Sequence, residues 1–160
     1  MIGLLLAVVI FNIIAFKINK RLTLAQIVQI WTFTIAFQLL FDLIIEFKFR
    51  SYWYFGEGID WKGLIPRTVL IPPVNIIFLN LYPWGKNVIL KGVYVISFVA
   101  MILLYELAAL LPEPWGYFHY GWWKIWYSAL IDPIILYILL GFYKWILWLE
   151  KKDRHKALPN

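Results

Sequence analysis

Five apolar stretches, separated by short polar or aromatic segments, constrain this chain more than any other feature. A helix needs roughly 17–25 mainly apolar residues to cross the hydrocarbon core of a bilayer. Only 15% of the 160 residues are charged, whereas soluble domains carry about 25%. The sequence therefore predicts an all-α, multi-pass membrane protein, a single domain built as a bundle of five transmembrane helices. We expect these helices at residues 2–16, 24–47, 64–82, 92–111 and 124–147.

The basic residues predict the orientation of the bundle. Cytoplasmic loops of membrane proteins carry an excess of Lys and Arg. If the amino terminus is outside, ten of the fifteen basic residues fall on the inner side and five on the outer side. The sequence thus predicts an external amino terminus and a cytoplasmic carboxyl terminus. Because the positive charge is scattered along helix ends, it indicates a lipid bilayer as the partner and not nucleic acid.

Four acidic residues lie inside or at the edge of the apolar stretches, together with Arg67: Asp42, Glu46, Glu106 and Asp132. Burying an ionised side chain in hydrocarbon costs at least ~3 kcal/mol, so such residues usually face an interior and mark function. Four carboxylates against one guanidinium leave three unbalanced if every group is ionised. We therefore expect some of them to keep a proton or to share a bound cation.

The positions of these acids suggest both functional and structural roles. Asp42 and Glu46 are four residues apart and share a helix face, although Glu46 can instead reach the lipid headgroups. Glu106 has apolar neighbours on both sides, which favours a buried position. Asp132 shares a face with Ser128 and, because a proline follows it, it is also a candidate cap for a half-helix.

Pro72 and Pro73 predict a kink or break in the third helix, because each removes a backbone donor. The carbonyl groups that lose their donors need partners in protein or in a wet cavity. Broken helices of this kind often build substrate sites in transporters. The alternative, which we favour, is a proline kink satisfied by neighbouring helices, with Asn75 and Asn80 forming hydrogen bonds between helices.

Two segments between the predicted helices, residues 51–58 and 115–123, are rich in aromatic residues and glycine. Aromatic faces attract organic cations, especially beside carboxylates. The alternative, which we also favour here, is an aromatic belt with loops lying flat on the membrane. The candidate aromatic rim of a binding site consists of Trp53, Tyr54, Tyr105, Tyr117, Tyr120 and Trp123.

Several kinds of chemistry have no signature in the sequence. There is no phosphate loop, dinucleotide fingerprint, zinc-binding helix motif or serine nucleophile elbow. The chain has no cysteine and two histidines, too few for a histidine-based metal site. We therefore predict no cofactor, no metal and no catalytic residues, and we favour a binding role over an enzymatic one.

From about residue 52 to residue 144, the chain resembles a family of small, uncharacterised integral-membrane proteins of spore-forming Gram-positive bacteria. The resemblance rests on an ordered series of motifs: Leu64-Ile65-Pro66, Pro72-Pro73, Phe78-Leu79-Asn80-Leu81-Tyr82-Pro83, Tyr94, Tyr105-Glu106, Gly116-Tyr117-Phe118-His119-Tyr120, Trp122-Trp123, Trp126-Tyr127-Ser128 and Asp132. It implies a bacterial cytoplasmic membrane protein. The family brings no established activity with it.

Three functional hypotheses follow. The first is a non-enzymatic protein whose outward-facing acidic pocket binds a proton, a cation or a small polar ligand, acting as a homo-oligomer or with a partner membrane protein in transport, sensing or an accessory role. The second is a structural or assembly subunit, and the third, less favoured, an enzyme acting on a lipid-linked substrate. The candidate ligand-binding residues are Asp42, Glu46, Arg67, Asn75, Glu106, Ser128 and Asp132.

Overall fold

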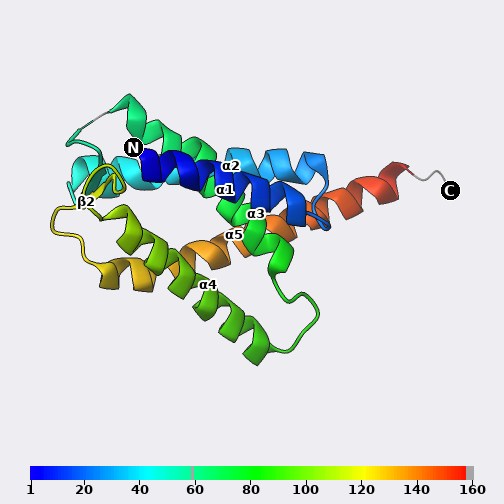
Figure 1. Ribbon diagram of the computed structural model, residues 1–160. Coiled ribbons are helices and arrows are strands. Elements are labelled where there is room, and N and C mark those ends of the chain that lie inside the picture. Colours follow the sequence, from blue (N-terminus) through cyan, green and yellow to red (C-terminus); the bar gives the residue numbers. More distant parts are fainter. Residues whose placement is uncertain (59, 158–160) are drawn as a thin grey trace.

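The computed structural model describes residues 1–58 and 60–157 and consists mainly of helices (Figure 1). Two π-helical segments extend the α-helices: η1 continues α2, and η3 leads into α3. In chain order, the helical elements are α1 (Ile2–Ile18), α2 (Leu24–Asp42), η1 (Leu43–Lys48), the 3-10 turn η2 (Trp61–Gly63), η3 (Pro66–Leu70), α3 (Ile71–Leu81), α4 (Val88–Ala109) and α5 (Ile125–Ala157).

The predicted all-α class with five helices is confirmed for the described residues. Four helical spans are long and apolar enough to cross a membrane, and α1 is a shorter apolar helix of 17 residues. The chain is therefore a multi-pass membrane protein. The largest difference from the predicted boundaries is in α5, which continues about ten residues beyond its apolar stretch. Its last turns are rich in charged residues that favour helix, which explains the extension.

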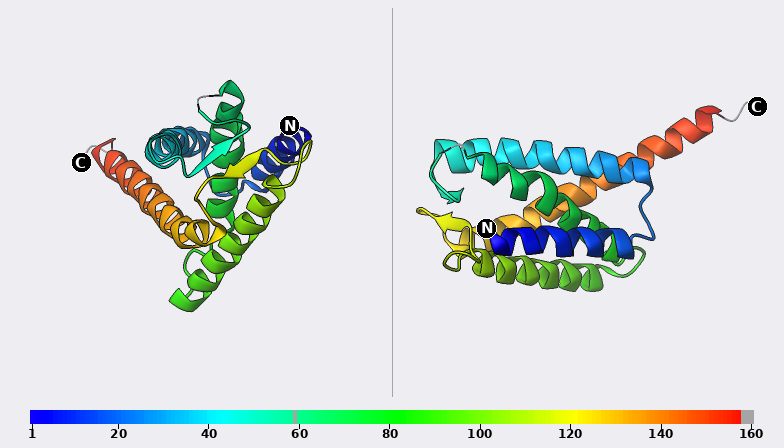
Figure 2. Two further views of the ribbon diagram at one scale, coloured as in Figure 1. Left: turned by 90° about the vertical axis from the view of Figure 1, so that its left-hand side faces the viewer. Right: turned by 45° about the horizontal axis from the view of Figure 1, so that its top comes forward.

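The helices form two groups that meet near the centre of the molecule (Figure 2). In the first group, α3 packs against both α1 and α2. In the second group, α4 packs along α5, and the main helix contact between the groups is that of α3 with α5. The side chains of Ile76, Phe78 and Leu79 on α3 are fully buried. These three residues make α3 the core of the bundle.

The two aromatic segments differ from the favoured expectation of loops lying flat on the membrane. They pair as antiparallel strands, β1 (Tyr52–Tyr54) and β2 (Phe118–Tyr120), with Trp53 opposite His119. Side chains alternate along a strand, so one face of this pair can turn inward. At the end of the pair, a Cβ atom on Gly121 would lie 2.6 Å from the Arg50 carbonyl oxygen. The strands and the adjoining Tyr117 and residues 121–123 are called the aromatic cap below.

The carbonyl groups that Pro72 and Pro73 leave without backbone donors are satisfied by neighbouring helices. The preceding π-helical turn ends with Ile71 N–H donating to the Pro66 oxygen. From there the chain takes up α-helical spacing, in which the amide of residue i bonds to the carbonyl of residue i−4, and Pro72 and Pro73 have no amide hydrogen for the carbonyls of Thr68 and Val69. The Trp31 indole on α2 donates to the Thr68 oxygen at 2.9 Å, and the Asn12 amide on α1 donates to the Val69 oxygen at 2.9 Å. The favoured interpretation, a proline site satisfied by adjacent helices, is thus confirmed for these carbonyls.

Asn75 forms the predicted hydrogen bond between helices, whereas Asn80 bonds to the loop between α1 and α2 and not to another helix. The Asn75 side chain donates to the Thr34 hydroxyl on α2 at 2.9 Å. Asn80 accepts from the backbone amides of Lys20 and Arg21, just after α1. Polar contacts of this kind contribute about 0.6 kcal/mol each on average within membranes. They fix α3 against both of its neighbours in the first group.

A double-mutant cycle tests the role of Trp31. Trp31→Phe should destabilise the protein by about 1–3 kcal/mol, because the Thr68 carbonyl is left without a donor. In a Pro72→Ala background the same substitution should cost much less, because an alanine at this position restores a backbone N–H for that carbonyl. Thermal or denaturant unfolding in lipid nanodiscs measures both effects. Equal costs in the two backgrounds would contradict this assignment.

Candidate functional site

The candidate site residues form two groups with different electrostatic surroundings. Asp42, Glu46 and Arg67 form a buried ionic cluster between α2, η1 and η3. Glu106 on α4 and Asp132 on α5 form a second group that lines one cavity, where the Ser128 hydroxyl bonds to Glu106. The structure therefore divides the candidate ligand-binding residues into two groups. Asp42 and Glu46 are paired with Arg67 and none of these three lines the cavity described below, whereas Glu106 and Asp132 line it without a basic partner among the described residues.

Within the ionic cluster, each of the three guanidinium nitrogens of Arg67 donates a hydrogen bond. Its Nε donates to Asp42 Oδ2 at 2.6 Å, its Nη1 donates to the Gly63 carbonyl at 2.6 Å, and its Nη2 donates to Glu46. A Cβ atom at Gly63 would lie 2.6 Å from Nη1, so a larger residue there would displace the guanidinium from this arrangement. The guanidinium carbon also lies 4.5 Å from the centre of the Tyr54 ring, a cation–π distance.

Asp42 is fully buried and accepts hydrogen bonds from three side chains. Besides Arg67, these are the Tyr52 hydroxyl at 2.6 Å and the Gln38 amide at 2.9 Å. Breaking a buried ion pair of this kind is strongly destabilising, because the remaining groups lose their partners. The cluster joins α2 and η1 to η3 and, through Tyr52, to the aromatic cap. Because these contacts connect four elements of the fold, they indicate a structural role for the cluster.

Glu46 also faces a second space at the outside of the cluster. This pocket has a volume of about 300 Å³ and is bounded by Glu46, Arg50, Trp53 and Glu57, among others. Trp53, a candidate rim residue, belongs here and does not line the inner cavity described below. Tyr52 lines both spaces, so its ring forms part of the wall between them.

The second group consists of neutral donors around two carboxyl groups. Glu106 Oε1 accepts from the Ser128 hydroxyl at 2.7 Å and from the Tyr120 hydroxyl. Ser128 in turn accepts from the Trp123 indole at 2.9 Å. Asp132 lies one turn beyond Ser128 on α5, and its buried Oδ2 has no hydrogen-bond partner among the described residues. Pro133 lies inside α5, so Asp132 does not cap a helix that starts there.

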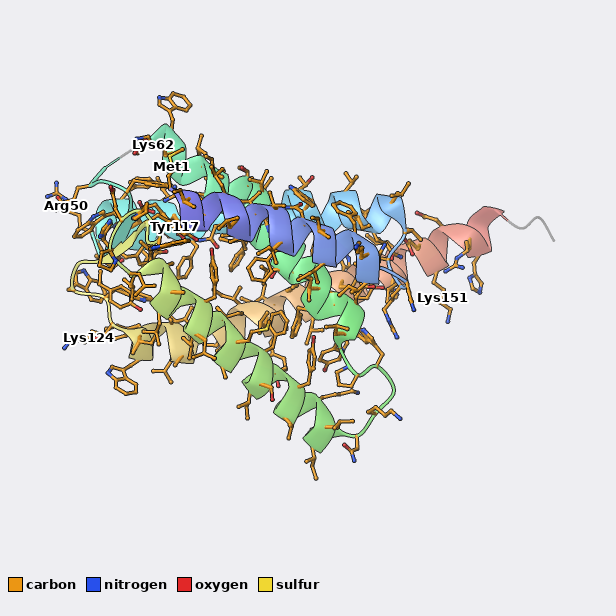
Figure 3. All side chains as sticks on the ribbon, viewed as in Figure 1. Met1, Arg50, Lys62, Tyr117, Lys124 and Lys151 are labelled. Atoms are coloured by element: carbon orange, nitrogen blue, oxygen red, sulfur yellow. The ribbon has the colours of Figure 1, made fainter. Side chains whose placement is uncertain are left out.

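Glu106, Ser128 and Asp132 line a cavity of about 230 Å³ between the two helix groups. Side chains from α1 to α5 and from the aromatic cap contribute to it. Its walls are mostly apolar or aromatic, and Gln38 and Asn75 add amide groups. Four of the candidate rim residues line it: Tyr54, Tyr105, Tyr117 and Trp123. Figure 3 shows Tyr117 near the end of the bundle that carries Met1 and Arg50.

Two features of the site were not predicted from the sequence. Tyr52 was not among the candidates, although its hydroxyl bonds to Asp42 and its ring lines both spaces. The strand pairing that turns Tyr52 inward has no short-range signal, because more than sixty residues separate β1 from β2. Phe11 and Phe41 also line the cavity, and nothing distinguishes them in sequence from other apolar helix residues.

The donor set of the cavity does not resemble a metal site. Within residues 1–58 and 60–157, no group of three or more His, Asp or Glu side chains is arranged to hold a metal ion. Comparison with protein-family models, curated proteins and solved structures finds no match to this chain. What the site does is therefore argued from its own geometry.

Tyr52 provides a pH test of the aromatic cap. Burial, and then the nearby Asp42 carboxylate, raise the pKa of Tyr52 well above its ordinary value. Since the pKa is higher in the folded than in the unfolded protein, its stabilising effect is complete below about pH 10 and is lost as the pH rises further. We expect unfolding in nanodiscs to be insensitive to this group up to about pH 9.5 and to become easier above about pH 10.

Tyr52→Phe is the matched variant for that experiment. It should be less stable than the parent at neutral pH, because Asp42 loses a donor, and the difference between the two proteins should shrink above about pH 10. Unfolding curves at each pH, with tyrosinate absorbance as a second signal, measure this. A difference that stays constant across the alkaline range would contradict the assignment of the titration to Tyr52.

Proposed function

We propose that this protein lies in the bacterial cytoplasmic membrane with its amino terminus outside and its carboxyl terminus in the cytoplasm. The excess of basic residues on the predicted inner side supports this orientation. In Figure 3, Arg50, Lys62 and Lys124 lie toward the end that carries Met1, whereas Lys151 lies toward the other end. The likeness to membrane proteins of spore-forming Gram-positive bacteria supports the bacterial origin.

We further propose that the cavity between the helix groups binds a proton, a cation or a small polar ligand from the outer side. The observation that carries this proposal is the buried Asp132 Oδ2, which has no donor among the described residues although it lines the cavity beside Glu106. Burying a carboxyl oxygen without a hydrogen-bond partner is costly. Such a group at membrane depth is a functional site by default.

The alternative function, a purely structural subunit, predicts a different arrangement of the acids. If their only task were to hold helices together, each acid would have its own donor and no cavity would remain. Asp42, Glu46 and Glu106 meet the first condition. Asp132 does not, and a cavity is present. The ionic cluster is thus assigned the structural role, and the Glu106–Asp132 group the binding role.

We propose a transport, sensing or accessory role for this binding site. The Ser128 hydroxyl, which also lines the cavity, donates to Glu106 and accepts from Trp123, so it fixes the position of Glu106. A bundle of five helices is small for a transporter. We therefore propose that the protein works as a homo-oligomer or with a partner membrane protein.

A hydrophobic carbodiimide, which reacts with protonated carboxyl groups in apolar surroundings, tests the proposed binding site. We expect it to label Glu106 or Asp132 in the purified protein, and a cation that occupies the site to slow this labelling. The panel of cations is Na⁺, K⁺, ammonium and alkylammonium ions. Mass spectrometry locates the label, and Asp42, paired with Arg67, is the internal control that should stay unlabelled.

Glu106→Gln and Asp132→Asn should each abolish the protection of the remaining carboxyl group while leaving the unfolding transition intact. Protection that is unchanged in both variants, or labelling that no cation of the panel slows, would overturn the proposed function. Labelling of Asp42 at the same rate as Asp132 would contradict the difference between the two groups of acids, in which Asp42 is paired with Arg67 and Asp132 has no basic partner among the described residues.

A further inference from the structure

We propose that the ligand of the cavity is a small organic ammonium ion that carries an apolar group. This inference rests on the proposed function and adds the chemical class of the ligand. Three properties of the cavity carry it: the charge of its polar end, the nature of its walls, and its size.

The polar end of the cavity carries two carboxyl groups, which become negative on losing a proton, and the donors around them are neutral. The ion pairs of the described chain involve Arg67 with Asp42 and Glu46, and none involves Glu106 or Asp132. Glu106 accepts from hydroxyl groups of Ser128 and Tyr120. Asp132 Oδ2 lacks a donor within the described residues. A positively charged N–H group supplies both the donor and the positive charge that this end of the cavity lacks among the described residues. Charge-assisted hydrogen bonds are about twice as strong as neutral ones.

The walls of the cavity favour an apolar body behind that charge. Apart from the polar groups already named, the lining includes Phe11, Phe41, Leu70, Ile102, Ile131 and Ile135. Hard inorganic cations require several oxygen ligands in place of their hydration shell, about six to eight for Ca²⁺. The cavity offers two carboxyl groups, and its amide and hydroxyl groups are set singly in a mainly apolar and aromatic wall, which is not the shell that such an ion needs. An ammonium ion needs fewer ligands, and its carbon substituent gains from contact with apolar and aromatic walls.

The size of the cavity limits the ligand to a small one. An engineered apolar cavity of roughly 150 Å³ admits benzene. The present cavity, at about 230 Å³, has room for one aromatic ring and a short chain. Phenethylammonium matches this description: it has one ring, two methylene groups and a primary ammonium group that can reach a carboxylate.

A homologous series of ligands tests the inference without any variant. Binding of methylammonium, propylammonium and phenethylammonium to the protein in nanodiscs of neutral lipid is measured by titration calorimetry, beside Na⁺, K⁺ and the neutral analogue propylbenzene. We expect the affinity to rise about fourfold for each methylene group that enters the cavity. Phenethylammonium should bind at least tenfold more tightly than methylammonium or propylbenzene.

Two neighbouring substitutions provide a matched pair. Ile131→Phe fills part of the cavity, so it should weaken binding of phenethylammonium at least tenfold and leave methylammonium unaffected. Leu130→Phe, at a position that is 69% exposed, should change the affinity for neither phenethylammonium nor methylammonium. Asp132→Asn should weaken both ammonium ligands at least tenfold.

The outcomes separate this inference from the proposed function. If Na⁺, K⁺ or methylammonium binds as tightly as phenethylammonium, and binding depends on Asp132, the ligand class is wrong and the proposed function stands. If propylbenzene binds as tightly as phenethylammonium, or Leu130→Phe acts like Ile131→Phe, the inference is overturned. If no ion of the series binds and no ion slows carbodiimide labelling, the inference and the proposed function fail together.

Discussion

Every polar group that this chain carries into the membrane has to be satisfied by another part of the protein, because lipid offers no hydrogen bonds. The arrangement around α3 follows from this constraint. Two prolines free the carbonyls of Thr68 and Val69, and side chains from α2 and α1 supply the missing donors. Immediately before them, Arg67 requires two carboxylates and the Gly63 carbonyl. These demands hold the first three helices together around a fully buried core.

Against this background, the Glu106–Asp132 group stands apart. The two helix groups meet mainly along α3 and α5, and the cavity lies between them under the aromatic cap. In the ionic cluster, negative charge is matched by Arg67 and by the donors Tyr52 and Gln38. In the cavity, the donors are neutral and one buried oxygen of Asp132 has none among the described residues. The same residue type is thus fully paired in the ionic cluster and leaves one buried oxygen without a donor, among the described residues, in the cavity.

Much of this could be predicted from the sequence, and the rest depends on contacts between distant residues. The apolar stretches predicted the five helices, and the prolines predicted freed carbonyls satisfied by neighbours. The four-residue spacing placed Asp42 and Glu46 on one face. Sequence spacing could not assign Arg67 to this pair of acids and leave Asp132 alone, because that depends on how α2, η3 and α5 pack. Nor could it pair β1 with β2, which brings Tyr52 to Asp42.

The most direct measurement compares the stabilities of Asp42→Leu and Asp132→Leu in nanodiscs without added ligand. Asp42→Leu should cost about 3 kcal/mol or more, because Arg67, Tyr52 and Gln38 each lose a buried partner. Asp132→Leu should be neutral or stabilising, because it removes a buried oxygen that has no donor among the described residues. Equal destabilisation by the two substitutions would contradict the division of the acids into a structural ionic cluster and a proposed binding group, Glu106 and Asp132.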